Sequence, residues 1–221
     1  MKPAEDDLIY NTRLTYPIAL VTASLCLAGC SKIKYPSYYA LNVPPPPSAS
    51  QPKPILGSVA VKTFTAPGFL REGPIVYRPA PDQVSFYDYH RWAEDPRREV
   101  TTAVVNEMRA RGLFRSVDVF DGHNSPECLL TGTLDHLEEV DGASEVSTEV
   151  SLSARLIDLR SGKVLWQDTS SKTSKLDQRS VPGIVAEMSR DLASAVERLV
   201  SSMQDRLAAQ AVAGGLEWPT Q

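Results

Sequence analysis

The residue types best suited to chemistry in this 221-residue chain are its three cysteines and three histidines. Cys128 is the only cysteine in the region expected to fold. As a nucleophile it would need His90, His123 or His136 as its base. A lone thiol without such a partner is usually a small buried apolar residue. We therefore expect Cys128 to be structural.

A second group of candidate side chains lies in the segment TLDHLEEVD, residues 133–141. Asp135, His136, Glu138 and Glu139 are residue types that bind metal ions. On a β-strand, neighbouring side chains point to opposite faces, so Asp135 and His136 would not converge on one ion. The sequence therefore favours a solvated strand end over a metal site.

Established signatures of catalysis and cofactor binding are missing from the sequence. It contains no nucleophile elbow, P-loop, dinucleotide fingerprint or zinc-protease motif. The polar run DTSSKTSK, residues 168–175, lacks the glycines that let backbone amides surround a phosphate. With 27 acidic against 23 basic side chains and a net charge of −4, the chain lacks the basic surplus of nucleic-acid binders. We expect no enzyme, no metal, no cofactor and no nucleic-acid partner.

An uncharged apolar run, LTYPIALVTASLCLAG, occupies residues 14–29. Its 16 residues fall short of the roughly 20 that a membrane-spanning helix needs, and they match the apolar core of a secretory signal. The run ends in LAGC, residues 27–30, which resembles the lipobox of bacterial lipoproteins. The resemblance implies cleavage after Gly29 and a diacylglycerol on Cys30. Because Ser31 and not Asp follows, it also implies the outer membrane of a Gram-negative cell, facing the periplasm.

Hydrophobic periodicity and turn residues predict the elements of the remaining chain. Strands are expected at 38–41, 55–63, 75–78, 84–87, 117–120, 128–140, 146–156 and 163–174. Asp95 followed by Pro96 predicts a helix that ends at Arg111, before Gly112. A second helix is expected from about Ser180, with apolar residues at three- and four-residue steps.

These elements predict one α+β domain, a mainly antiparallel sheet of five or more strands with two helices packed on it. The expected organisation is a signal peptide at 1–29 and a lipidated tether at 30–54, which holds the first short strand and a proline-rich linker. The α+β domain follows at 55–212, and a disordered tail at 213–221. We interpret the six prolines between residues 42 and 54 as an extended, inert connector.

Two stretches, Phe64 to Tyr77 and Phe86 to Trp92, hold more large apolar and aromatic residues than a loop requires. Large aromatic side chains usually bury in the core, but Tyr, Trp and Arg are also the favoured anchors of partner surfaces. Both interpretations stay open from sequence. The candidate docking residues are Phe69, Tyr77, Tyr89, Arg91 and Trp92.

The order of the motifs resembles one known family. The lipobox is followed by YYAL at 38–41, by YHRWAE at 89–94 before the first helix, by GLF at 112–114, and by a long hairpin with Trp166 in its second arm. This pattern is similar to the ABC-type transport auxiliary lipoprotein family, which includes the paraquat-inducible protein C group.

The resemblance implies a role in moving lipids, chiefly phospholipids, across the cell envelope. Expected partners are an ABC permease, its ATPase and a periplasmic MCE-domain protein, with the membrane reached through the lipid anchor. Contact with phospholipid and a ring of identical subunits are further implications. An activator of a cell-wall synthase remains an alternative, and a lipid-anchored hydrolase would need a nucleophile and a base that the sequence does not assemble.

Overall fold

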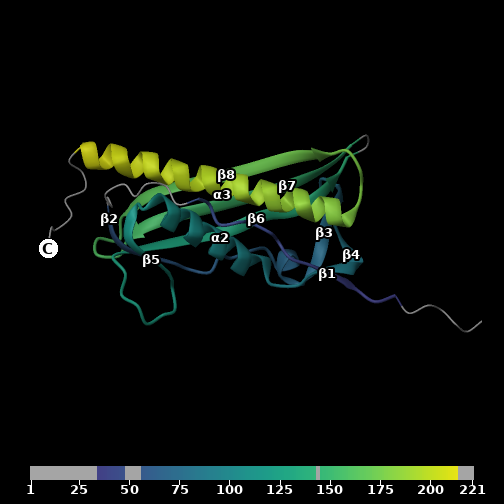
Figure 1. The fold of residues 1–221 in the computed structure, drawn as a ribbon, viewed down its shortest axis with the longest axis horizontal. Helices are drawn as coiled ribbons and strands as arrows, with labels where there is room; N and C mark the ends of the chain where they lie inside the picture. The colour runs from purple at the N-terminus through teal and green to yellow at the C-terminus, as the bar shows by residue number, and fades with distance from the viewer. Residues whose placement is uncertain (1–33, 48–55, 143–144, 214–221) are drawn as a thin grey trace, which may run out of the picture. The chain divides into compact units, whose positions relative to one another are not determined.

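The computed structural model describes residues 34–47, 56–142 and 145–213, which form eight strands, two α-helices and one short 3-10 helix (Figure 1). The elements are β1 (Ser37–Tyr39), β2 (Leu56–Val61), η2 (Gly68–Arg71), β3 (Pro74–Ala80), β4 (Gln83–Trp92), α2 (Pro96–Arg111), β5 (Phe114–Val119), β6 (Cys128–Asp141), β7 (Val146–Asp158), β8 (Val164–Leu176) and α3 (Val181–Val212). The signal segment, Cys30 and the tail expected after residue 213 lie outside the described residues. The architecture is a single α+β domain, as predicted.

The eight strands form one mixed sheet around β6. Along one edge of β6, β7 and β8 continue the sheet in antiparallel order. Along the other edge, β2 and β3 each pair with a different part of β6, both in parallel. The long ladders β6–β7 and β7–β8 are antiparallel, as predicted, and the parallel pairs make the sheet mixed rather than purely antiparallel. A crossover that contains α2 joins β2 to its parallel neighbour β5, and such connections are what parallel pairing requires.

Local signals define α2 as the sequence predicted. The Asp95 carboxylate accepts a hydrogen bond from the backbone N–H of Arg97, and Pro96 occupies the first turn. Gly112 ends the helix in the left-handed conformation with φ 61°, and its N–H donates to the carbonyl of Arg109. The buried face of α2 contains Val100, Val104 and Met108.

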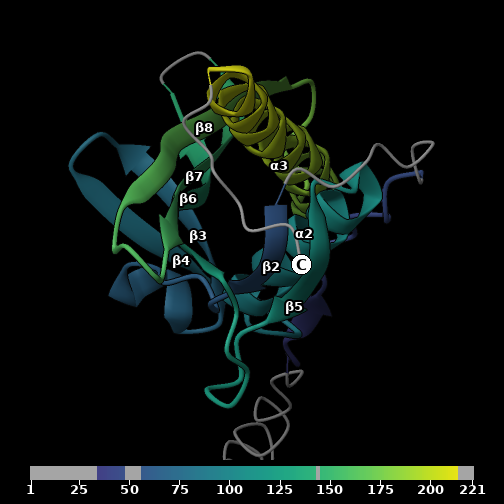
Figure 2. The ribbon, with the colours of Figure 1, turned by 90° about the vertical axis from the view of Figure 1, so that its left-hand side faces the viewer.

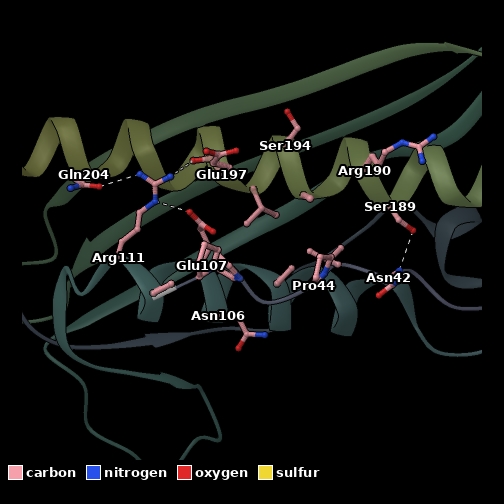
Figure 3. A pocket seen from close by; sticks show the side chains of 17 residues that line it. Asn42, Pro44, Asn106, Glu107, Arg111, Ser189, Arg190, Ser194, Glu197 and Gln204 are labelled. Carbon is pink, nitrogen blue, oxygen red and sulfur yellow. Dashed lines mark hydrogen bonds and ion pairs between the residues drawn. The ribbon is translucent and has the colours of Figure 1, made fainter. Parts of the chain in front are cut away.

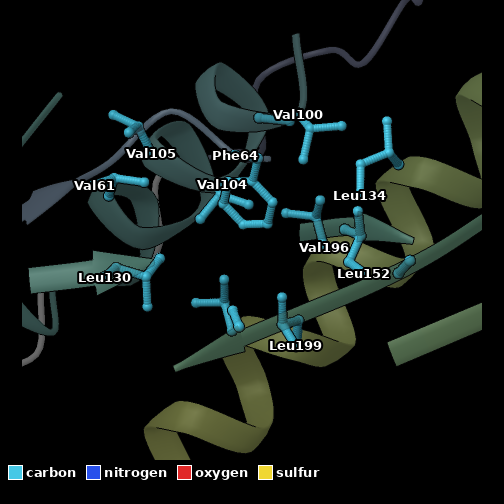
Figure 4. Packing of buried hydrophobic residues seen from close by; sticks show 14 of the residues in the cluster. Val61, Phe64, Val100, Val104, Val105, Leu130, Leu134, Leu152, Val196 and Leu199 are labelled. Carbon is cyan, nitrogen blue, oxygen red and sulfur yellow. The ribbon is translucent and has the colours of Figure 1, made fainter. Parts of the chain in front are cut away.

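The second helix, α3, begins after Ser180, whose hydroxyl accepts a hydrogen bond from the N–H of Gly183. Its apolar stripe lies against β7 and β8, and the sheet curves around both helices (Figure 2). The core fills the space between the helices and the sheet (Figure 4). No described helix is long and apolar enough to cross a membrane.

Phe64 sits in this core against Gly132 of β6. A Cβ atom on Gly132 would lie 2.4 Å from the Phe64 ring, so the bare glycine makes room for the aromatic side chain. Phe64 is 1% exposed, and its backbone N–H donates to the hydroxyl of Thr101 on α2. The segment after β2 is thus held to the helix layer and to the sheet.

The first short strand belongs to the sheet. β1 pairs in parallel with the end of β4, and the carbonyl of Tyr39 accepts a hydrogen bond from Ala93. The domain was expected to start at residue 55, but the sheet already includes β1, which lies before that residue. The stretch FYDYHRW is part of β4, which is longer than the strand expected at 84–87.

Candidate functional site

Cys128 lies at the start of β6 and is fully buried. Burial raises the pKa of its thiol to about 12, and the negative charges of Asp158 and Glu127 add to the effect. A thiol with this pKa is protonated at neutral pH and is a poor nucleophile. This environment matches the structural role expected for Cys128.

The three histidines have other partners. His90 Nδ1 lies 2.9 Å from the hydroxyl of Tyr39, and His136 Nδ1 lies 2.9 Å from Glu138 Oε1. His123 caps its own turn through the carbonyl of Asp121. Among the described residues, none of the three rings is hydrogen-bonded to the sulfur of Cys128.

A cluster of possible metal ligands does form on the outer face of the sheet. His136 and Glu138 lie two residues apart on β6 and so share a face, and Glu149 lies directly opposite Glu138 on β7. Ligand atoms of these three residues lie within 4.8 Å of one another. Asp135 is not part of this cluster, in line with the alternation argument, but that argument overlooked that His136 and Glu138 share a face and meet Glu149 across the strand pair.

Arg78 of β3 supplies a positive charge to this cluster. Its Nε lies 3.0 Å from Oε1 of Glu138 and its Nη2 lies 3.1 Å from Oε2, so both carboxylate oxygens are occupied. Glu138 is fully buried. The guanidinium competes with a metal ion for the same oxygens, and the cluster is an ion pair extended by His136.

Glu139 faces the helix side of the sheet, next to the packed rings of Tyr77, Tyr87 and His90. The hydroxyl of Tyr87 donates a 2.5 Å hydrogen bond to Glu139 Oε2, and Arg179 Nε lies 2.8 Å from Oε1. Burial and the adjacent carboxylate raise the pKa of Tyr87 to about 12. Glu138 and Glu139 are both fully buried, so the expected solvated strand end is not observed.

The five candidate docking residues do not share one surface. Trp92 is 6% exposed and belongs to the core, as the competing interpretation held. Phe69, in η2, packs partly buried against that core. The ring of Tyr77 lies 5.0 Å from that of Tyr87. On β4, Tyr89 is exposed and Arg91 is half-buried.

A groove of about 840 Å³ lies between α2 and α3 (Figure 3). Small side chains line it, among them Ala103 and Ala110 from α2 and Ala193 from α3. Residues 42–47 form its rim, where the backbone N–H of Asn42 donates to the hydroxyl of Ser189. The first part of the proline-rich segment thus borders the groove, which the interpretation as an inert linker did not anticipate.

Polar groups close one end of this groove. Arg111 Nε donates to Glu107 Oε1 over 2.6 Å, and its Nη1 donates to Gln204 Oε1 over 3.2 Å. The bond to Gln204 links α2 to α3 across the groove, and Glu107 holds the guanidinium from its own helix (Figure 3). The groove can hold an apolar segment by shape, with hydrogen-bonding groups at its end to set register. Its shape suits the binding of another surface, and its described lining residues do not pair a nucleophile with a base.

Comparisons with known proteins agree with this architecture. Residues 39–212 match the family described as ABC-type transport auxiliary lipoprotein component. The chain belongs to this family. The match begins in β1 and ends at the last residue of α3, so it covers the sheet, both helices and the groove of this auxiliary lipoprotein.

Solved structures share the fold of the auxiliary lipoprotein. A Xanthomonas campestris protein superposes with a TM-score of 0.67 at 17% identity, covering 79% of this chain and 99% of its own. An uncharacterized protein superposes with a TM-score of 0.59 at 15% identity, covering 76% and 99%. No curated protein matches the sequence significantly.

Proposed function

We propose that this auxiliary lipoprotein is a non-catalytic, lipid-anchored subunit of an ABC transport system that moves lipids, chiefly phospholipids, across the bacterial envelope. Cys30 carries the lipid, and the domain faces the periplasm from the outer membrane. Its partners are the permease, the ATPase and an MCE-domain protein that forms the periplasmic conduit. The observation that carries this proposal is the family match over residues 39–212.

The character of the buried groups supports a binding role over catalysis. The one described thiol has a pKa raised to about 12, and the buried carboxylates Glu138 and Glu139 are paired with Arg78 and Arg179. Paired buried charges fix side-chain positions more than they create reactivity. Such a domain acts through its surface.

We place the docking of the transport partner in the groove between α2 and α3. Its volume of about 840 Å³ falls in the range of sites that hold a peptide segment or a drug-sized ligand. The alanines on both helices allow close approach of a partner helix or extended segment. Of the residues first considered for docking, only Tyr89 is exposed, and none of the five lines the groove.

Copurification of the lipoprotein with the MCE-domain protein, from cells that express the whole system, tests the proposal. Ala193→Arg puts a long charged side chain into the groove and should reduce recovery of the partner at least tenfold. Ala186→Arg, on an exposed position of α3 outside the groove, is the matched control. Equal recovery with both variants would contradict docking in the groove.

Gene neighbourhood distinguishes the two candidate systems. Adjacent genes for a permease, an ATPase and an MCE protein support the transport role. Adjacent genes for cell-wall synthases, with copurification of a synthase, would instead support the activator alternative.

A further inference from the structure

Two exposed tyrosines of the described chain lie on the paired strands β1 and β4. Three tyrosines are among the exposed large hydrophobic residues: Tyr35, which precedes β1, Tyr38 on β1 and Tyr89 on β4. Tyr38 is 63% exposed and Tyr89 is 40% exposed. The other exposed large hydrophobic residues are all aliphatic: Val119, Leu159, Val164 and Val212.

The pairing of β1 with β4 determines which side chains lie together. Tyr38 is the partner of Arg91, and Tyr39 is the partner of the buried Trp92. Because neighbouring side chains alternate between faces, Tyr38 and Arg91 share the face opposite Trp92. The guanidinium of Arg91 makes no ion pair with any carboxylate in the described part of the chain, so its charge is available to an external anion.

The aliphatic exposed residues are remote from this edge. Leu159 and Val164 flank the β7–β8 turn, where Cys128 at the start of β6 pairs with Asp158. β1, β4 and β3 gather at the other end of β6, as Figure 1 shows. The domain thus has an aromatic, cationic edge at one end and aliphatic residues at the other.

The length of chain before β1 indicates what this edge contacts. Ser37 follows Cys30 by seven residues. Seven fully extended residues span at most about 25 Å. A lipid on Cys30 would therefore hold β1 within that distance of the bilayer, and this step rests on the proposed lipidation.

We propose that the β1–β4 edge, defined by Tyr38, Tyr89 and Arg91, lies against the phospholipid headgroups of the membrane that holds Cys30. Tyrosine is favoured at membrane interfaces because its ring is apolar and its hydroxyl is polar. An arginine guanidinium matches a phosphate with paired hydrogen bonds. The edge therefore orients the domain on the membrane, in addition to the tether that keeps it there.

Fluorescence quenching of the lipidated full-length protein tests this orientation. Tyr38→Trp and Val164→Trp place a tryptophan at either end of the domain, and each variant is reconstituted in phosphatidylethanolamine–phosphatidylglycerol vesicles that contain brominated phospholipid. After subtraction of the parent protein's fluorescence, we expect quenching and a blue shift for Tyr38→Trp and neither for Val164→Trp. Floating vesicles that carry protein with an unquenched tryptophan at position 38 would overturn the edge contact alone.

Flotation itself separates this result from the proposed function. Protein that does not float with the vesicles would overturn the lipid anchor and the edge contact together. A blue shift at position 38 without quenching by brominated lipid would assign the edge to a protein partner, such as a second copy, and would overturn membrane contact.

The contribution of the guanidinium is measured in the Tyr38→Trp background. Arg91→Gln should lower the ratio of membrane-bound to free edge by about fivefold on vesicles with phosphatidylglycerol. Arg155→Gln, on an exposed arginine of β7, is the control and should leave quenching unchanged. Equal quenching in both variants would contradict a phosphate contact by Arg91.

Discussion

Thr148 of β7 donates its hydroxyl hydrogen to Oδ2 of Asp191 on α3 over 2.5 Å, although both residues are almost fully buried. Ser174 of β8 donates to the other carboxylate oxygen over 2.6 Å. Two strands are thereby attached to one helix through a single carboxylate. Buried polar groups are expensive unless they are bonded, so this contact defines one position of α3 on the sheet.

Replacing Asp191 by Ala should lower the free energy of unfolding by about 2–4 kcal/mol, because the buried Thr148 hydroxyl and the half-buried Ser174 hydroxyl lose their acceptor. Urea denaturation followed by circular dichroism measures the change. Asp205→Ala, on the exposed side of the same helix, is the control and should change stability by less than about 0.5 kcal/mol. Similar midpoints for both variants would show that the carboxylate is not needed at this interface.

Gly132→Ala should destabilise the fold by about 1–3 kcal/mol, the usual cost of overpacking a core. The added methyl group would lie 2.4 Å from the Phe64 ring, which has no free space to move into. Thermal unfolding checks this expectation. In Gly68→Ala the nearest atom is the end of the Arg71 side chain at 3.8 Å, so that variant should unfold near the parent temperature.

Arg78→Ala should cost about 3 kcal/mol, because it leaves the buried Glu138 carboxylate opposite Glu149 without its guanidinium. Without the Arg78 guanidinium, His136, Glu138 and Glu149 form a potential cation site. We expect ZnCl2 to raise the melting temperature of Arg78→Ala but not that of the parent. Zinc stabilisation of the parent protein would show that Arg78 does not exclude the metal.

Because the pKa of Tyr87 is raised, we expect the protein to lose stability at high pH. This pKa is about 12 in the folded protein and 10.0 without the fold, so the unfolded chain releases the proton first. The contribution of the protonated Tyr87 hydroxyl to the free energy of unfolding is complete below pH 10 and is lost as the pH rises toward 12. Tyr87→Phe lacks this proton, so its stability relative to the parent should improve between pH 10 and 12. A constant difference across that range, measured by urea denaturation, would contradict a Tyr87 pKa raised by burial and by Glu139.

The features that could be predicted from sequence depend on residues close together in the chain. The N-cap Asp95, Pro96 and Gly112 lie within one helix and its ends, and the alternation in β7 reports one buried face directly. The bulge before His136 was not predictable, because it depends on how β7 pairs with β6. The parallel pairing of β1 with β4 joins residues about fifty positions apart, with no local signal.

Aromatic content alone did not distinguish surface from core. Trp92 and Tyr89 lie on the same strand, yet one is buried and the other is exposed. Alternation puts these two residues on opposite faces, but aromatic content does not say which of the two faces the core covers. The groove was likewise unpredictable, since α2 and α3 contribute residues separated by about ninety positions.

α3 and β6 have matched lengths, since 32 helical residues at about 1.5 Å and 14 strand residues at about 3.3 Å each give roughly 45–48 Å. Because the helix runs along the hairpin, the pair resists bending as a stiff spacer. A partner bound near the β7–β8 turn would therefore stand a fixed distance from the β1 edge. Fixing the β1 edge on a surface would therefore also fix the height of the β7–β8 turn above that surface.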